Sequence, residues 1–244
     1  MKILNAQYQH PFTCIVAGPT RAGKSTFVKK FILNHSNFVN VIFDYIIIVL
    51  GTEAKENITL SSLVDETSLT QNTTVEVIEL KKLFPDKKWI EEFPPFFEDM
   101  FKNKKKLNGC IIFDDLMSEM AECDILLDLY TKKSSHFNIS IINITQNVFF
   151  KGSGKRASDN VTIYRNTHVL VIFKNPMDNT IMTIIAKRIG SNRYKDLIKM
   201  LQYIVDKYRY VVIQGNFNSL EQLRFSSDIF ATEPFPHQKV FQLD

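Results

Sequence analysis

The sequence has few cysteines, no long hydrophobic run and no histidine spacing typical of a metal site. Its three cysteines cannot all pair and form no C-x-x-C motif, so we expect reduced thiols, with Cys14 and Cys110 in the core. The most apolar run, Tyr45–Leu50, is far shorter than the ~20 residues of a membrane span. The amino-terminal segment turns polar after four residues, which predicts no secretory signal. We expect a protein that is neither secreted nor embedded in a membrane.

The 244 residues, with 45% hydrophobic and 23% charged side chains, are sufficient for a buried core and predict an ordered chain. Short apolar runs alternate with helical patterns, which is typical of a mainly parallel α/β sheet flanked by helices. We therefore predict a single domain over residues 1–244, with a variable insert at about 52–106 and an extended tail at about 231–244. The predicted strands are Phe12–Ala17, Tyr45–Leu50, Gly109–Phe113, Ile139–Ile144, Val169–Phe173 and Tyr210–Ile213.

The stretch GPTRAGKS matches the phosphate-binding pattern G-x-x-x-x-G-K-[ST] and lies between an apolar run and a helical pattern. In this pattern backbone N–H groups hold phosphate oxygens, the lysine neutralises the β- and γ-phosphates, and the hydroxyl after it ligates Mg²⁺. The sequence thus predicts a site for ATP and Mg²⁺, with Lys24 as the phosphate lysine and Ser25 as a metal ligand. The predicted nucleotide-binding residues are Gly18, Pro19, Thr20, Arg21, Ala22, Gly23, Lys24, Ser25 and Thr26.

Two aspartates end the apolar run that begins at Gly109. A carboxylate at the carboxyl end of a strand can hold the water shell of Mg²⁺, and a second one can deprotonate the attacking water. We assign the metal role to Asp114 and the water role to Asp115. Gln146 ends the following strand, and if that strand lies between the other two, its amide is near the γ-phosphate.

Some nucleotide-binding classes lack their signature here, while others remain open. The sequence has no N-K-x-D motif for guanine recognition and no L-S-G-G-Q stretch of ABC ATPases. A small-molecule P-loop kinase, or an assembly protein that binds nucleotide without hydrolysing it, stays possible on these residues alone.

The chain resembles the FtsK/HerA-type DNA-packaging ATPases of double-stranded DNA viruses, specifically those of Maverick/Polinton elements, adintoviruses and virophages. The Asp-Asp-Leu-Met and Thr-Gln-Asn-x-Phe combinations are the most specific part of the resemblance, which is weak only from Thr52 to Lys106. The matching stretches are Pro11–Val28, Ile111–Met120, Leu129–Gly152, Asn166–Asp178 and Lys207–Phe230.

This resemblance implies a RecA-like P-loop fold with strand order 5-1-4-3-2 and an ATPase that moves double-stranded DNA into a preformed capsid. It further implies a homo-oligomeric ring of five or six copies, contacts with capsid or portal-vertex proteins, and a location at viral assembly sites in the host cytoplasm or nucleus.

Two groups of positively charged residues gain candidate roles from this resemblance. The family tends to carry an arginine ahead of the asparagine that opens the fifth strand. This chain has Arg165 and, further back, Arg156; we favour Arg165 as the residue that reaches a neighbouring copy's γ-phosphate. The glycine-rich stretch Lys151–Asn160 reads as a loop. Its cations are either a solvated surface or contacts to DNA phosphates, for which the candidates are Lys151, Lys155 and Arg156.

Overall fold

The computed structural model describes residues 8–51, 58–65, 73–83, 89–102, 104, 106–116, 125–149, 157–190, 193–215, 224–230 and 239–242. Within these ranges no helix combines the length and the apolar character needed to cross a bilayer.

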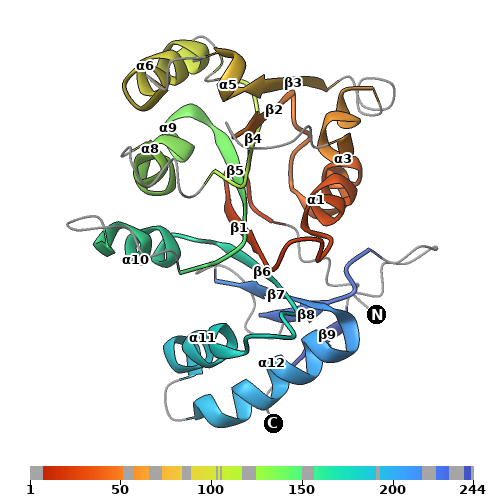
Figure 1. The fold of residues 1–244 in the computed structure, drawn as a ribbon. Helices are drawn as coiled ribbons and strands as arrows, with labels where there is room; N and C mark the ends of the chain where they lie inside the picture. Colours follow the sequence, from red (N-terminus) through yellow and green to blue (C-terminus); the bar gives the residue numbers. More distant parts are fainter. Residues whose placement is uncertain are drawn as a thin grey trace.

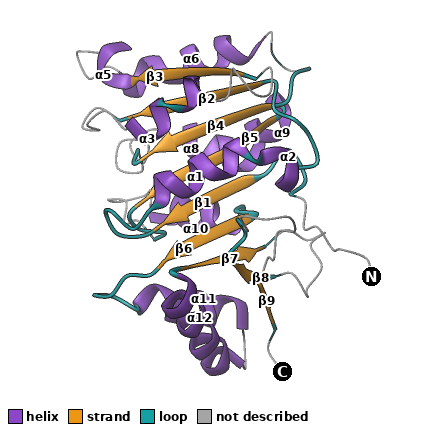
Figure 2. Ribbon diagram, turned by 90° about the vertical axis from the view of Figure 1, so that its right-hand side faces the viewer, coloured by secondary structure: helices purple, strands orange, loops and turns teal. Residues whose placement is uncertain are grey.

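The described strands form one nine-stranded sheet, in the order β3-β2-β4-β5-β1-β6-β7-β8-β9 (Figure 2). The six strands from β3 to β6 are parallel, and the other three are antiparallel to their neighbours. The strands are β1 (Thr13–Ala17), β2 (Tyr45–Leu50), β3 (Thr74–Glu79), β4 (Gly109–Asp114), β5 (Ile139–Thr145), β6 (Val169–Phe173), β7 (Tyr210–Gln214), β8 (Phe225–Ser227) and β9 (Lys239–Phe241).

Helices cover both faces of this sheet, with α1 and α3 on one face and α8, α9 and α10 on the other (Figure 1). The described helices are α1 (Lys24–Leu33), α2 (His35–Phe38), α3 (Ile58–Ser61), α5 (Leu80–Leu83), α6 (Trp89–Lys102), α8 (Ile125–Asp128), the π-helix η1 (Leu129–Lys133), α9 (Ser134–Phe137), α10 (Ala157–Arg165), α11 (Thr180–Gly190) and α12 (Tyr194–Tyr208).

Strand β1 shows why the central strands are mainly apolar. All five of its residues are buried. Because side chains alternate along a strand, Ile15 and Ala17 pack with the helices on one face, whereas Cys14 and Val16 pack with α1 on the other. A parallel strand covered on both faces therefore shows a continuous apolar run rather than an alternating one.

The five strands for which we predicted the order 5-1-4-3-2 appear as β6-β1-β5-β4-β2. The complete sheet differs from that five-strand prediction, because β3 extends one edge and β7, β8 and β9 extend the other. The finer assignment to a RecA-like fold stays a prediction.

One sequence prediction needs correction. The predicted loop Lys151–Asn160 is wrong over Ala157–Asn160, which form the first turn of α10; the rest of it lies outside the described residues. The predicted insert at about 52–106 contributes β3, which pairs in parallel with β2 along its whole length. In the predicted tail, Lys239–Phe241 form β9.

Candidate active site

The loop between β1 and α1 depends on two glycines for different reasons. Gly18 is buried, and a Cβ at this position would lie 2.5 Å from Cβ of Phe173 on the adjacent strand β6. Gly23 precedes α1 with φ of 100°, a left-handed conformation that side chains disfavour. The first helical hydrogen bond follows, from the Phe27 N–H to the Gly23 carbonyl at 2.9 Å. Close strand packing and helix initiation thus require glycine at these two places.

The middle of the loop is a turn, in which the Ala22 N–H donates to the Pro19 carbonyl at 3.2 Å. Arg21 is exposed and has a left-handed φ of 65°, which costs a residue with a Cβ roughly 1–2 kcal/mol. Strained backbone of this kind occurs at ligand-binding loops. Arg21 therefore takes part through its backbone conformation in shaping the loop.

Lys24 bends back over the loop that precedes it. Its Nζ donates to the carbonyls of Gly18 at 2.7 Å and Pro19 at 2.9 Å. Burial lowers the pKa of Lys24 below that of a free lysine, and the carboxylates of Asp115 and Asp114 oppose this by favouring the ammonium form. The ammonium group is thus centred on the loop, with two carboxylates close enough to influence its charge.

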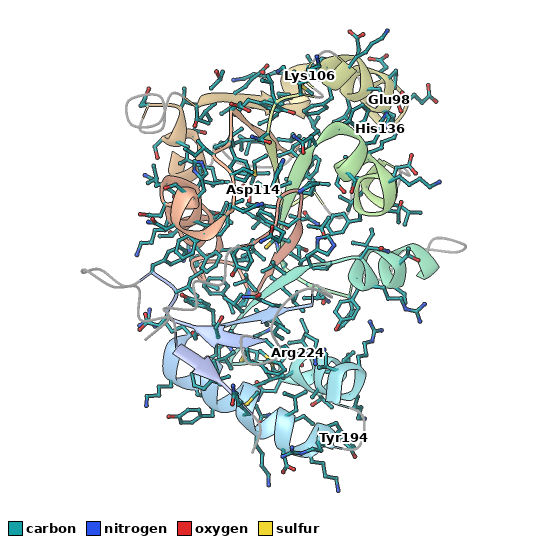
Figure 3. The ribbon with its side chains drawn as sticks, turned by 180° about the vertical axis from the view of Figure 1, so that it is seen from behind. Glu98, Lys106, Asp114, His136, Tyr194 and Arg224 are labelled. Atoms are coloured by element: carbon teal, nitrogen blue, oxygen red, sulfur yellow. The ribbon has the colours of Figure 1, made fainter. Side chains whose placement is uncertain are left out.

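Asp114 and Asp115 occupy the carboxyl end of β4, where the sequence predicted a pair of acids. Asp114 is the last residue of the strand and only 7% exposed, in the interior of the molecule (Figure 3). It is level with Ile144 of β5, which in turn is level with Val16, one residue before the end of β1. Asp115 turns away with φ of 54°, and its N–H donates to the Ile144 carbonyl at 2.9 Å. The parallel register brings the acids to the same end of the sheet as residues 18–26, the loop predicted to bind phosphate, which is called the phosphate loop below.

Gln146 meets Asp115 across 31 residues of sequence. The Gln146 side-chain amide donates from Nε2 to Oδ2 of Asp115 at 2.9 Å, and both side chains are exposed. This bond leaves the other carboxylate oxygen of Asp115 available as a hydrogen-bond acceptor. The structure therefore unites Lys24, Asp114, Asp115 and Gln146 at one sheet edge.

The same site has the donors that a nucleotide with Mg²⁺ requires. Ser25 lies half-buried in the first turn of α1, and Thr26 beside it is exposed. Among the described residues no cluster of three or more His, Cys, Asp or Glu side chains could enclose a metal ion. Mg²⁺ in phosphate sites uses one or two protein ligands, with water and phosphate oxygens supplying the rest. Ser25 and Asp114 fit that requirement.

Arg165 lies away from this site within its own chain. It is exposed at the end of α10, and the carbonyl of the following residue, Asn166, accepts a 2.5 Å hydrogen bond from Oγ1 of Thr13. Thr13 begins β1, and the phosphate loop follows that strand, about 16 Å away for five residues of strand. Arg165 therefore lies near the amino-terminal ends of the parallel strands, whereas the Lys24 site of the same chain lies at their carboxyl ends.

The predicted DNA contacts Lys151, Lys155 and Arg156 lie outside the described residues.

Two contributors to the site had no role assigned to them from the sequence. Phe173 closes the space beside Gly18, and no sequence motif indicates which side chain will face the loop from β6. Asn147 organises the backbone after Gln146: its Oδ1 accepts from the Phe149 N–H at 3.0 Å. An asparagine side chain commonly accepts a hydrogen bond from the backbone N–H two residues later in a turn, so Asn147 itself is the sequence signal.

No protein-family model matches the chain, and no curated protein matches it in sequence. Among solved structures it is similar to B204, the DNA-packaging ATPase from Sulfolobus Turreted Icosahedral Virus, with 17% identity and a TM-score of 0.49 over 84% of this chain and 93% of that one. It is also similar to the cytoplasmic domain of EssC, with 14% identity and a TM-score of 0.46 over 95% of this chain and 39% of that one.

Proposed function

We propose that this chain hydrolyses ATP at the Lys24 site. The observation that carries the proposal is the hydrogen bond between Gln146 and Asp115, made at the same sheet edge where Lys24 is influenced by Asp114 and Asp115. A phosphate-binding loop alone is common to kinases, GTPases and motors. An acceptor carboxylate beside that loop, held by an amide from the adjacent strand, favours attack by water.

The residues divide the work as follows. Backbone N–H groups of the loop bind phosphate oxygens. The Lys24 ammonium also binds phosphate oxygens, which replace the Gly18 and Pro19 carbonyls as its hydrogen-bond acceptors. Ser25 and Asp114 are the residues that would hold Mg²⁺, which would neutralise charge on the phosphates. Asp115 accepts the proton of the attacking water, and Gln146 holds the carboxylate in place through its 2.9 Å bond.

We further propose that hydrolysis drives double-stranded DNA into a viral capsid, by a homo-oligomeric ring of five or six copies at viral assembly sites in the host cell. The support is the resemblance of several ordered sequence stretches to viral packaging ATPases. In such a ring Arg165, at the edge opposite its own phosphate loop, serves the site of a neighbouring copy. Lys151, Lys155 and Arg156 are proposed to contact DNA phosphates, and capsid or portal-vertex proteins are the proposed docking partners.

The test is release of free phosphate from ATP with Mg²⁺, measured with and without duplex DNA. We expect Lys24→Ala and Asp114→Ala each to lower turnover by about 100-fold or more, because each removes a charge that stabilises the phosphates or their metal. Lys29→Ala is the matched control: Lys29 lies on the same helix but contacts Oγ of Ser62 at 2.8 Å, and its loss should leave turnover unchanged.

The outcomes separate the alternatives. Phosphate release without any acceptor supports a hydrolase, whereas dependence on an added small-molecule acceptor indicates a kinase. ATP binding without release, with or without DNA, indicates a nucleotide-binding assembly protein. Full turnover in Lys24→Ala contradicts the site itself.

A further inference from the structure

An arginine on α11 lies against two aromatic rings from different parts of the chain. The guanidinium carbon of Arg188 is 4.4 Å from the centroid of the Phe149 ring and 4.9 Å from that of the Tyr164 ring. The two rings are themselves 5.2 Å apart and tilted by 52°. A guanidinium this close to two π-faces is attracted to both. Arg188 thus joins the segment after β5, helix α10 and helix α11.

The position of Phe149 is coupled to that of Gln146 through the intervening backbone. Oγ1 of Thr145 accepts from the Asn147 N–H at 3.3 Å and donates to the Asn147 carbonyl at 3.1 Å. The next bond runs from the Phe149 N–H to Oδ1 of Asn147 at 3.0 Å, and Val148 is buried between them with 2% exposure. The five residues Thr145–Phe149, linked in this way, move as a unit, so a constraint on Phe149 is also a constraint on Gln146.

Tyr164 is fixed on its own side. The preceding residue, Ile163, is buried in the core, and the Thr167 N–H donates to the Tyr164 carbonyl at 3.2 Å. Burial raises the pKa of Tyr164, and the charges of Arg188 and Arg224 act in the opposite direction. Tyr164 therefore provides Arg188 with a stationary surface.

We propose that Arg188 is a positioning residue that holds the Thr145–Phe149 segment against α10 and so keeps Gln146 directed at Asp115. The inference rests on the proposed function, because Gln146 has a task only if water is activated at Asp115. Among the described residues, Arg188 contacts the Phe149 and Tyr164 rings rather than a residue of the phosphate loop. Its effect on catalysis is thus indirect, through the orientation of a side chain that holds the Asp115 carboxylate.

Three variants separate the positive charge of Arg188 from the stacking of its guanidinium on the rings, and both from a nonspecific effect of changing α11. Arg188→Ala removes both ring contacts, whereas Arg188→Lys keeps a cation that can lie over a ring. Lys187→Ala is the matched control, because Lys187 is the preceding residue of α11 and lies over a different ring, Tyr194, at 5.9 Å. Figure 3 shows Tyr194 at the outer end of the molecule, apart from Arg224.

Two measurements are made on the full chain: steady-state ATP hydrolysis, and amide hydrogen exchange of residues 145–149 in the absence of nucleotide. For Arg188→Ala we expect kcat to fall about five- to tenfold with KM unchanged, and exchange in that segment to rise by a similar factor. Arg188→Lys should recover part of both effects, and Lys187→Ala should match the unmodified chain in both.

Unchanged exchange in Arg188→Ala overturns the proposal, as does an equal change in Lys187→Ala. Faster exchange with unchanged kcat overturns the catalytic part. If the unmodified chain releases no phosphate, the proposed function fails. The exchange measurement still decides independently whether Arg188 positions the segment.

Discussion

Substituting alanine for Gly18 tests how tightly the phosphate loop is packed against the sheet. The new Cβ would lie 2.5 Å from Cβ of Phe173 and 3.5 Å from its Cα. Carbon atoms in contact normally lie about 3.5–4.0 Å apart, so the two strands would have to separate by roughly 1 Å at this point. Because the obstructing atom is the Cβ of Phe173, no rotation of the phenylalanine side chain can relieve the clash.

The neighbours of Phe173 limit how far strand β6 can withdraw. Phe173 is 6% exposed, and its ring lies 6.0 Å from that of Phe27 and 5.4 Å from that of Tyr210. Overpacking of this kind costs about 1–3 kcal/mol, which for a chain of this size lowers Tm by roughly 2–12 °C. The displacement also moves the backbone that leads into the loop, on which Lys24 is held through the Gly18 and Pro19 carbonyls. Because a displaced loop no longer directs its N–H groups at the phosphates, we expect nucleotide affinity to fall about tenfold or more.

Thermal unfolding by circular dichroism gives the first quantity, and titration with a fluorescent ATP analogue gives the second. Gly215→Ala is the control, since its Cβ would lie 3.2 Å from the Thr167 carbonyl oxygen, near the opposite sheet edge. That variant should lose less stability and bind nucleotide normally. A Gly18→Ala protein with the Tm and affinity of the unmodified chain would refute the packing argument.

Two further predictions concern catalysis and pH. Gln146→Leu should lower kcat about tenfold, because a hydrogen bond from an amide to a carboxylate is worth about 1.5 kcal/mol or more. The rate of phosphate release measures kcat, and an unchanged kcat would show that the 2.9 Å hydrogen bond to Asp115 has no role in turnover. Burial lowers the pKa of His10, His35 and His168, so the unfolded chain binds protons first as pH falls. The free energy of unfolding should be highest above about pH 6.5 and decrease below it. Urea unfolding at about pH 7.5 and about pH 5.5 measures this, and equal urea midpoints at the two pH values would contradict it.

The central strands were predictable because burial on both faces leaves a local signature. The run Tyr45–Leu50 is buried at every position and forms β2 with the predicted bounds. Strand β3 lacks that signature: it forms the edge of the sheet, and most of its residues are half-buried or exposed. β8 has only three residues, too few for a periodic pattern, and exists because β7 supplies hydrogen-bond partners.

For the candidate active site too, features encoded by neighbouring residues were predictable, and features that depend on distant residues were not. Each residue of the phosphate loop is close in sequence to the others, so spacing alone indicated their joint role. Asp115 and Gln146 come together only because β4 and β5 are adjacent and in register. Strand adjacency is a long-range property, and it was anticipated from the usual strand order of P-loop proteins rather than from the residues themselves.

By itself the sequence determined the loop with its two glycines, the apolar strands beside it, and the identity of the charged residues. Local sterics and periodic burial govern these features, and neighbouring residues encode both. Only the tertiary structure decided that Phe173 faces Gly18, that Arg165 lies at the edge opposite its own phosphate loop, and that Arg188 reaches Phe149. These depend on how β6, α10 and α11 pack against the sheet, and packing is a property of distant side chains acting together.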